Sequence, residues 1–267
     1  LRENRELLRN ISPERIFSEL KGILCARGAG KMLLAFPEVL FVILPELAPM
    51  RGFDTRRPQN HCWDVWGHTA HAVDAIAPES VLRLTMLFHD SGKPETFRYD
   101  AQAGFGRFPG HPAVSARIAD AALRALRCDN AARERVLTLV ENHEMRTGRG
   151  KKDLRRLLAK IGEENMRDLL LVRRADAAAH APEAAARLTT LADEDERILH
   201  EITAERGCLH VKDLAVSGND LLALGLKPGA AVGETLSRLL DLVLDEEVPN
   251  EKGALLAAAR KEMQTHE

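Results

Sequence analysis

The stretch LRLTMLFHDSGK, residues 82–93, decides the fold because it ends an apolar segment with His89 and Asp90 side by side. Leu82, Met86 and His89 fall at i, i+4 and i+7, so this histidine continues the apolar face of a predicted helix. Burying an imidazole beside a carboxylate costs free energy unless both groups are hydrogen-bonded or bound to an ion. A core histidine with a local aspartate partner explains one such pair by itself, so the choice between that interpretation and a metal site depends on the rest of the chain.

Four further residues of the same chemistry continue or begin apolar helical faces: His68, His111, His143 and Asp176. The aspartate is the clearest case, because Leu169, Val172 and Asp176 fall at i, i+3 and i+7 and place a carboxylate where a leucine is expected. Four histidines and two aspartates directed at one core need a common partner, and such ligands suit Mn, Fe, Co, Ni or Zn. The set therefore predicts a site for one or two divalent transition-metal ions, with Asp90 shared where there are two.

A two-metal site of this kind predicts hydrolysis of a phosphate ester. Two neighbouring ions generate hydroxide at neutral pH and stabilise a phosphoryl group under in-line attack. Asp90 would then have a catalytic role. A structural role, or contact with substrate phosphate as cations, would also explain His111 and His143. Three other histidines are expected at the surface or beside the ligands: His61, His71 and His180.

Length and composition predict an all-α protein. The 267 residues can bury a large core, and aromatic residues make up only 4% of them. The expected exception is a small β-hairpin formed by residues 96–99 and 105–108. Near the other end of the chain, a helix is expected over 234–244, and Asn250 is expected to cap a final helix over 251–262.

The formal net charge is −2, so a nucleic-acid surface would have to be a local patch. Residues 146–160 hold seven Lys or Arg against one Asp, which is typical either of a solvated helix face or of contacts along an RNA backbone. These two interpretations have equal weight. The glycine-rich stretch 225–233 offers backbone N–H groups to a phosphate, or forms a tight turn. The candidate RNA-binding residues are Arg146, Arg149, Lys151, Lys152, Arg155, Arg156 and Lys227.

The cysteines and the apolar runs predict a cytoplasmic protein. The four cysteines form no C-x-x-C pair and indicate neither a zinc ribbon nor a disulfide framework. The apolar run at residues 39–47 is too short to span a bilayer, and we expect no signal peptide. No membrane partner is therefore expected.

The six ligands, taken as a set, resemble the HD-domain metal-dependent phosphohydrolases. The family's H…HD…D pattern corresponds here to His68, His89, Asp90 and Asp176. The extra histidines of its dinuclear branch correspond to His111 and His143. Lys93 in HDSGK matches the family's HDxGK, in which a lysine near the site can meet substrate phosphate. The resemblance implies an HD-type helical core with catalytic roles for Asp90 and Lys93.

A second resemblance covers nearly the whole chain. Segments such as RENRELLRNISPERIFSEL (2–20), LFHDSGKPETF (87–97) and SGNDLLALGLKPGAAVGETLSRLLDLV (217–243) resemble the later part of bacterial tRNA nucleotidyltransferases, which are CCA-adding enzymes and relatives of poly(A) polymerase. It implies a neck-like helical segment at residues 1–60, an HD domain at 61–185 and a helical tRNA-binding body at 186–267.

The resemblance leaves two functions open. One is phosphatase or 2′,3′-cyclic phosphodiesterase activity of the HD domain, with nucleotides, cyclic phosphates or tRNA and RNA 3′ ends as substrates. The other is a non-catalytic tRNA-binding module of a split or truncated CCA- or A-adding enzyme. The family's nucleotidyltransferase head, with its GS and paired-Asp motif, has no counterpart in these 267 residues. Nucleotide addition is therefore expected only if a separate head is supplied.

Overall fold

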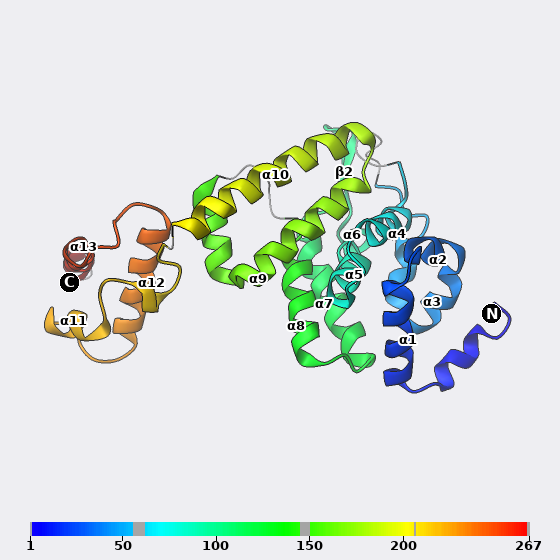
Figure 1. Cartoon of the computed structure of the whole chain (residues 1–267), viewed down its shortest axis with the longest axis horizontal. Coiled ribbons are helices and arrows are strands. Elements are labelled where there is room, and N and C mark those ends of the chain that lie inside the picture. Colours follow the sequence, from blue (N-terminus) through cyan, green and yellow to red (C-terminus); the bar gives the residue numbers. More distant parts are fainter. Residues whose placement is uncertain (1, 56–61, 145–149, 206, 266–267) are drawn as a thin grey trace. The chain divides into compact units, whose positions relative to one another are not determined.

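The computed structural model describes residues 2–55, 62–144, 150–205 and 207–265 (Figure 1). Contacts divide the chain into two units: unit 1 comprises residues 1–147 and 167–193, and unit 2 comprises residues 148–166 and 194–267. Two long helices contribute residues to both units, α9 (Lys151–Ala178) and α10 (Pro182–Ala204). Gly162, with φ +80° and ψ 163°, interrupts α9, so two helical segments meet there.

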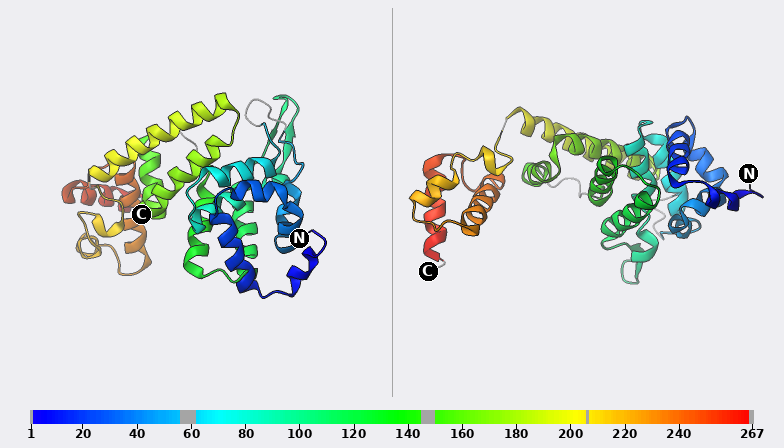
Figure 2. Two further views of the ribbon diagram at one scale, coloured as in Figure 1. Left: turned by 45° about the vertical axis from the view of Figure 1, so that its right-hand side comes forward. Right: turned by 90° about the horizontal axis from the view of Figure 1, so that it is seen from below.

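In its described residues, unit 1 consists of helices and one β-hairpin, as the composition predicted. Its further elements are η1 (Arg5–Asn10), α1 (Pro13–Cys25), α2 (Ala29–Ala35), α3 (Pro37–Ile43), η2 (Pro45–Met50), α4 (Val65–Ala75), α5 (Ser80–Phe88), α6 (Lys93–Thr96), β1 (Arg98–Asp100), β2 (Phe105–Arg107), α7 (His111–Ala125) and α8 (Asn130–Asn142). The two strands pair antiparallel, with Tyr99 opposite Gly106, and the hairpin stands out from the helices of this unit in Figure 2. The predicted all-α fold with a small hairpin is therefore confirmed.

Helix α5 forms the centre of unit 1. It packs against α1, α4, α7 and α8, and every residue from Leu82 to Phe88 is buried. A helix that is surrounded by other helices can be apolar on all sides, which accounts for the run LRLTMLF. The helix ends immediately before His89 and Asp90, so its packing carries these two residues into the interior.

Close packing of α2 on α4 depends on a glycine. A Cβ atom on Gly30 would lie 2.1 Å from the carbonyl oxygen of Ala70, a distance that no side chain tolerates. The backbone N–H of Gly30 donates to Asp74 Oδ1 at 2.8 Å. The contact fixes α4, which carries His68, against the N-terminal helices.

Unit 2 has a separate apolar core. Its elements are the first part of α9, the end of α10, η3 (Val211–Asp213), α11 (Gly218–Ala223), α12 (Ala230–Leu244) and α13 (Lys252–Thr265). The core residues are Leu214, Val216, Leu221, Leu239, Leu255 and Ala259. Among the described residues, no helix has both the length and the apolar character needed to cross a membrane.

Two expectations about unit 2 need correction. Helix α12 begins at Ala230 rather than at residue 234, because the glycine-rich turn ends at Gly229, which has φ +134°. Asn250 precedes α13, but its side chain bonds to the segment before α11 instead. Its Oδ1 accepts from the N–H of Ala215 at 2.8 Å, and its Nδ2 donates to the carbonyl of Asp213 at 2.9 Å. Asn250 therefore ties two loops of the unit together.

Candidate metal centre

Five helices of unit 1 carry the six ligands that the sequence predicts. In chain order they are His68 in α4, His89 and Asp90 directly after α5, His111 at the start of α7, His143 directly after α8 and Asp176 in α9. The structure brings all six together. The four histidines and Asp90 are at most 6% exposed, so the cluster lies inside the unit rather than on its surface.

The carboxylate of Asp90 lies between two pairs of histidines. Its Oδ2 is 3.3 Å from Nε2 of His89 and 3.6 Å from Nε2 of His68. Its Oδ1 is 3.3 Å from Nε2 of His111 and 3.6 Å from Nε2 of His143. Each oxygen of one aspartate therefore faces a different group of nitrogen atoms, which suits a ligand shared between two ions.

Asp176 adds a second carboxylate to one of the two groups. Its Oδ1 lies 2.8 Å from Nε2 of His68 and 3.6 Å from Nε2 of His89. Within the pairs, the Nε2 atoms are also close, at 3.4 Å between His68 and His89 and 3.2 Å between His111 and His143. The first group thus has two nitrogens and two carboxylates, and the second has two nitrogens and one carboxylate.

Backbone carbonyls orient all four imidazole rings. The contacts join Nδ1 of His89 to Met86 O (2.7 Å), of His111 to Phe108 O (3.1 Å), of His143 to Val140 O (2.7 Å) and of His68 to Ala179 O (3.3 Å). A carbonyl can only accept, so Nδ1 carries the proton. In a neutral ring, Nε2 then presents its lone pair to the centre, as a metal ligand must.

Burial and neighbouring charges shift the pKa values of the centre in different directions. Burial lowers the pKa of His68 and of His143, which favours the neutral rings that bind a metal. Burial alone would also lower the pKa of His89, but Asp90 and Asp176 raise it to about 10. Against the effect of burial, His89 holds the pKa of Asp90 well below its usual range, and His68 does the same for Asp176. Both aspartates are therefore ionised at neutral pH.

The donor set fits a divalent cation. Oδ1 of Asp90 is buried and, among the described residues, has no hydrogen-bond partner. Its neighbours His111 and His143 offer lone pairs rather than protons when Nδ1 is protonated. A cation would satisfy the oxygen and both nitrogens at once. The ligand atoms of His68, His89 and Asp90 form one group within 4.8 Å of one another, and those of Asp90, His111 and His143 form another; such nitrogen and oxygen donors suit a transition metal.

Gly92 brings the end of the Asp90 segment against the start of α7. A Cβ atom on Gly92 would lie 2.6 Å from the carbonyl oxygen of His111 and 2.8 Å from the backbone nitrogen of Ser115. The N–H of Gly92 also donates to Oγ of Ser115 at 2.8 Å. This close approach holds Asp90 near His111.

Lys93, which the resemblance places near substrate phosphate, is paired with Asp90. Its Nζ lies 2.6 Å from Oδ2 of Asp90, and the residue is 8% exposed. The ammonium group also lies 5.6 Å from the centre of the Phe108 ring. The charge of Lys93 therefore already compensates a ligand carboxylate.

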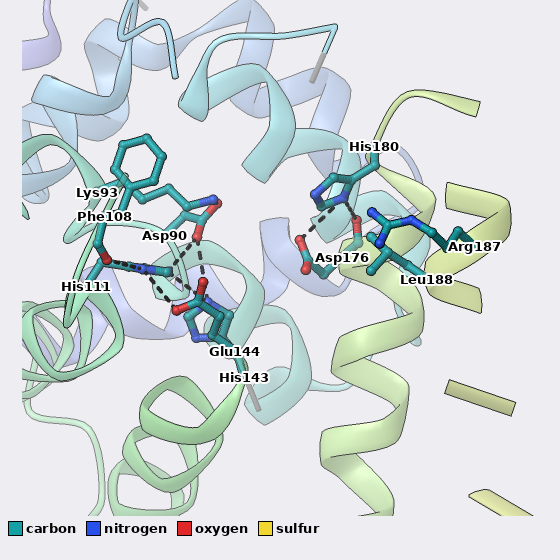
Figure 3. A pocket seen from close by; sticks show the side chains of 10 residues that line it. All are labelled: Asp90, Lys93, Phe108, His111, His143, Glu144, Asp176, His180, Arg187 and Leu188. Carbon is teal, nitrogen blue, oxygen red and sulfur yellow. Dashed lines mark hydrogen bonds and ion pairs between the residues drawn. The ribbon is translucent and has the colours of Figure 1, made fainter. Parts of the chain in front are cut away.

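A pocket of about 230 Å³ leads to the centre (Figure 3). All of its lining residues belong to unit 1: Asp90, Lys93, Phe108, His111, His143, Glu144, Asp176, His180, Arg187 and Leu188. Four of the six predicted ligands line it: Asp90, His111, His143 and Asp176. Solvent thus reaches a centre whose ligands are otherwise buried.

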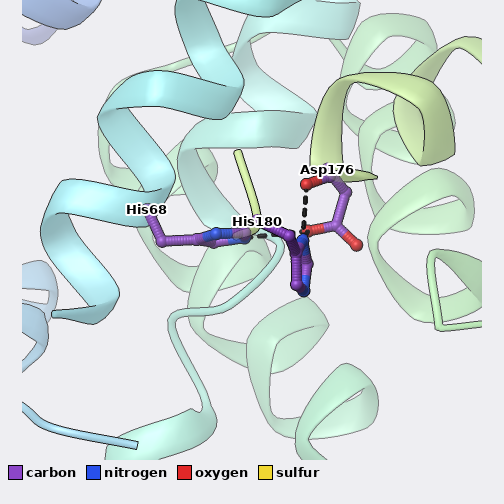
Figure 4. A group of neighbouring side chains, drawn as sticks. All are labelled: His68, Asp176 and His180. Atoms are coloured by element: carbon purple, nitrogen blue, oxygen red, sulfur yellow. Dashed lines mark hydrogen bonds and ion pairs between the residues drawn. The ribbon is translucent and has the colours of Figure 1, made fainter. Parts of the chain in front are cut away.

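His180 lies beside the ligands, which is one of the two places that the sequence left open for it. Its Nδ1 donates to the backbone carbonyl of Asp176 at 2.8 Å, and its ring centre lies 4.9 Å from that of His68 (Figure 4). Ligand atoms of these three residues form a further group that could hold a metal ion. The four-residue spacing from Asp176 is the signal that could have found it. His71, by contrast, stacks on Trp63 at 4.5 Å, and His61 lies outside the described residues.

Four of the predicted RNA-binding residues form ion pairs inside unit 2. Lys151 pairs with Glu205, and Lys152 Nζ lies 3.0 Å from Asp245 Oδ2. Arg155 reaches Glu205 at 3.0 Å and Glu246 at 2.6 Å, while Arg156 reaches Asp245 at 2.6 Å. The hydrogen bond to Asp245 raises the pKa of Arg156. This first part of α9 therefore has intramolecular partners for its charges.

The remaining predicted RNA-binding residues are placed differently. Lys227 is exposed and lines a pocket of about 430 Å³ in unit 2, together with Arg238, Glu234 and Glu262. Arg146 and Arg149 lie outside the described residues. RNA contact by this whole set stays a prediction.

The fold and the site define an all-α protein with a buried histidine–aspartate centre suited to divalent metal ions. Its sequence matches the family model described as "tRNA nucleotidyltransferase domain 2 putative" over residues 113–259 and the model described as "Probable RNA and SrmB-binding site of polymerase A" over residues 1–50. The chain belongs to the tRNA nucleotidyltransferase family. The resemblance of the sequence to the later part of tRNA nucleotidyltransferases is thereby confirmed.

Two characterised relatives are similar over most of the chain. A CC-adding tRNA nucleotidyltransferase of Thermus thermophilus is 36% identical over 236 residues, which are 85% of this chain and 52% of the relative. An A-adding tRNA nucleotidyltransferase of Deinococcus radiodurans is 30% identical over 243 residues, which are 85% of this chain and 54% of the relative. The chain thus spans about half the length of these relatives.

Proposed function

We propose that unit 1 is an HD-type metal-dependent phosphohydrolase that acts on phosphomonoesters or 2′,3′-cyclic phosphates. The observation that carries the proposal is the position of Asp90, with each carboxylate oxygen facing its own pair of histidines. A set of satisfied core residues would not leave Oδ1 of Asp90 buried and without a donor among the described residues. The relatives are named for tRNA, so RNA 3′ ends are the proposed natural substrates.

The proposed ligands divide between the two sides of Asp90. One ion would be held by His68, His89, Asp176 and Oδ2 of Asp90, and a second by His111, His143 and Oδ1 of Asp90. Bound ions of this kind supply Lewis-acid activation of water and compensate the charge of the phosphoryl group. The identity of the metal stays within Mn, Fe, Co, Ni and Zn.

The chain's own residues prepare the site. The carbonyls of Met86 in α5, Val140 in α8 and Phe108 just after β2 hold the imidazole Nε2 atoms toward the centre. Lys93 donates a hydrogen bond to the carboxylate of Asp90 in the metal-free protein. Phe108 and Leu188 provide apolar surface at the pocket. A buried, preoriented ligand set needs little rearrangement to bind an ion.

The test compares metal content and hydrolysis in matched variants. We expect one to two metal ions per chain in protein purified without chelator, and hydrolysis of 2′,3′-cyclic AMP that chelator abolishes. Asp90→Asn should lose both metal and turnover while the circular dichroism spectrum stays helical. His68→Gln and His71→Gln form a matched pair on α4. Only His68→Gln should lose metal, because His71 stacks on Trp63.

Two results would contradict the proposal. Retention of full metal content by Asp90→Asn would refute the shared ligand. Absence of both metal and turnover with Mn, Co, Ni or Zn added would mean that the six side chains have a structural role.

The second candidate function is a tRNA-binding module, and the match of residues 1–50 to an RNA-binding-site model favours it. It is compatible with the first, because none of the six proposed metal ligands lies within residues 1–50. A tRNA affinity that falls steeply with salt would support it. For the nucleotide addition for which the relatives are named, we propose that this chain would additionally need a separate head, as the sequence resemblance implies.

A further inference from the structure

Two of the residues that line the pocket over the centre have long basic side chains, Lys93 and Arg187. Lys93 is already paired with Asp90 at 2.6 Å and is buried. A phosphate in the pocket would therefore have to compete with Asp90 for this ammonium group. Lys93, which the sequence motif indicates for phosphate binding, is therefore not the cation that is available to bind a phosphate.

Arg187 is the available cation. It is exposed on α10, and within the described part of the chain no carboxylate lies within ion-pair distance of it. Figure 3 shows its guanidinium end turned toward His180 and Asp176, on the far side of the pocket from Lys93. An unpaired guanidinium at the mouth of an otherwise carboxylate-rich pocket is suited to bind an anion.

We propose that Arg187 binds the non-bridging oxygens of the substrate phosphate and makes this site favour phosphomonoesters over cyclic phosphates. The inference rests on the proposed phosphohydrolase function and names the preferred substrate class of the same site. A guanidinium offers two parallel N–H donors that match two oxygens of one phosphate.

The number of phosphate oxygens supplies the preference. A phosphomonoester carries about two negative charges and three acceptor oxygens at neutral pH. When one oxygen faces the metal centre, two remain for the guanidinium fork. A 2′,3′-cyclic phosphate has one fewer of each, so only a single contact to Arg187 remains.

The size of the pocket favours an end group as well. Its volume of about 230 Å³ is below the roughly 300–1,000 Å³ of sites that enclose a drug-sized ligand. It has room for a phosphoryl group and part of a sugar, and the rest of the substrate would lie outside. A terminal phosphate on an RNA or nucleotide meets both conditions.

The first test is equilibrium binding of inorganic phosphate, measured by calorimetry on the full chain with its metal bound. Arg187→Ala should weaken phosphate binding about tenfold, and Arg187→Lys less, because one charge-assisted contact contributes about 1.5 kcal/mol. Arg197→Ala is the matched control. Arg197 is on the same helix, is 62% exposed in its side chain and pairs with Glu201 instead of lining the pocket. It should bind phosphate as the wild type does.

The second test is kinetic. In Arg187→Ala, KM for 3′-AMP should rise about tenfold while KM for 2′,3′-cyclic AMP rises about threefold or less, with metal content unchanged. Equal phosphate affinity in Arg187→Ala and wild type, or no phosphate binding by the wild type, would overturn the inference. Equal rises in KM for both substrates would overturn the preference. Absence of metal and turnover in the wild type would instead overturn the proposed function, and the same phosphate titration, made on the metal-free chain, would still decide the role of Arg187.

Discussion

Nζ of Lys93 lies 2.6 Å from Oδ2 of Asp90, and the two residues are 8% and 1% exposed. Oδ2 is also the oxygen that faces His68 and His89. Lys93 therefore pairs with the same carboxylate oxygen that a bound metal ion would contact. Its removal should separate the stability of the metal-free protein from that of the metal-bound protein.

We expect Lys93→Met to destabilise the metal-free protein by about 3 kcal/mol, because removing one partner leaves a buried charge without compensation. Added metal should restore a larger share of stability to this variant than to the wild type, since the ion takes over that compensation. Urea unfolding with and without Mn measures both quantities. Lys31→Met, at an exposed position, is the control. Equal destabilisation in both metal states would show that Lys93 acts through packing alone.

Gly92→Ala should disturb the centre without touching a ligand. The residue has φ −82°, which alanine adopts freely, so the effect is the clash of the new Cβ with the backbone of His111 and Ser115. We expect a loss of about 1–3 kcal/mol in unfolding free energy and weaker metal binding.

Gly22→Ala is the matched control for Gly92→Ala. Gly22 lies in α1, and a Cβ there would meet nothing within 4 Å. Alanine should stabilise this helix by about 0.5–1 kcal/mol. Unchanged metal affinity in Gly92→Ala would mean that the approach of Asp90 to His111 does not depend on this glycine.

The sequence predicted the convergence of the six ligands because periodicity reports which side of a helix is buried. His143 and Asp176 each follow the stripe of their own helix, and both reach the centre. The ligand set also predicted that Asp90 is shared where there are two ions, and in the structure its two oxygens face two different histidine pairs.

Periodicity could not supply contacts that form between distant segments. Arg187 is an ordinary exposed arginine by its neighbours in sequence, and only the fold places it at the pocket. The same limit applies to Arg156, whose basic neighbourhood is as typical of RNA contact as of ion pairing. Its partner Asp245 is 89 residues away in the chain. The start of α12 was predicted four residues too late, because the residues around Val232 lie within the glycine-rich stretch that was interpreted as a turn.

Metal binding should release about one proton per chain at neutral pH. In the metal-free protein Asp90 and Asp176 raise the pKa of His89 from its usual 6.5 to about 10. The ring therefore still carries its second proton at neutral pH, and a metal ion must displace that proton to bind. Metal affinity should therefore increase with pH, by up to about tenfold per unit between 6.5 and 10. Calorimetry in buffers with different ionisation enthalpies counts the proton. A binding enthalpy that does not depend on the buffer would contradict the raised pKa.

The salt dependence of tRNA binding should distinguish Lys227 from the paired cations of α9. Each phosphate contact contributes about 0.9 to the slope of log affinity against log salt. We expect Lys227→Ala to reduce that slope by about this amount, because Lys227 is exposed. Arg156→Ala should leave the slope unchanged and lower the thermal midpoint, because a phosphate would first have to displace Asp245, which lies 2.6 Å from the guanidinium. Binding of one tRNA measured between about 50 and 200 mM salt covers the useful range. A lower slope in Arg156→Ala with the thermal midpoint unchanged would show that this arginine exchanges its carboxylate partner for RNA.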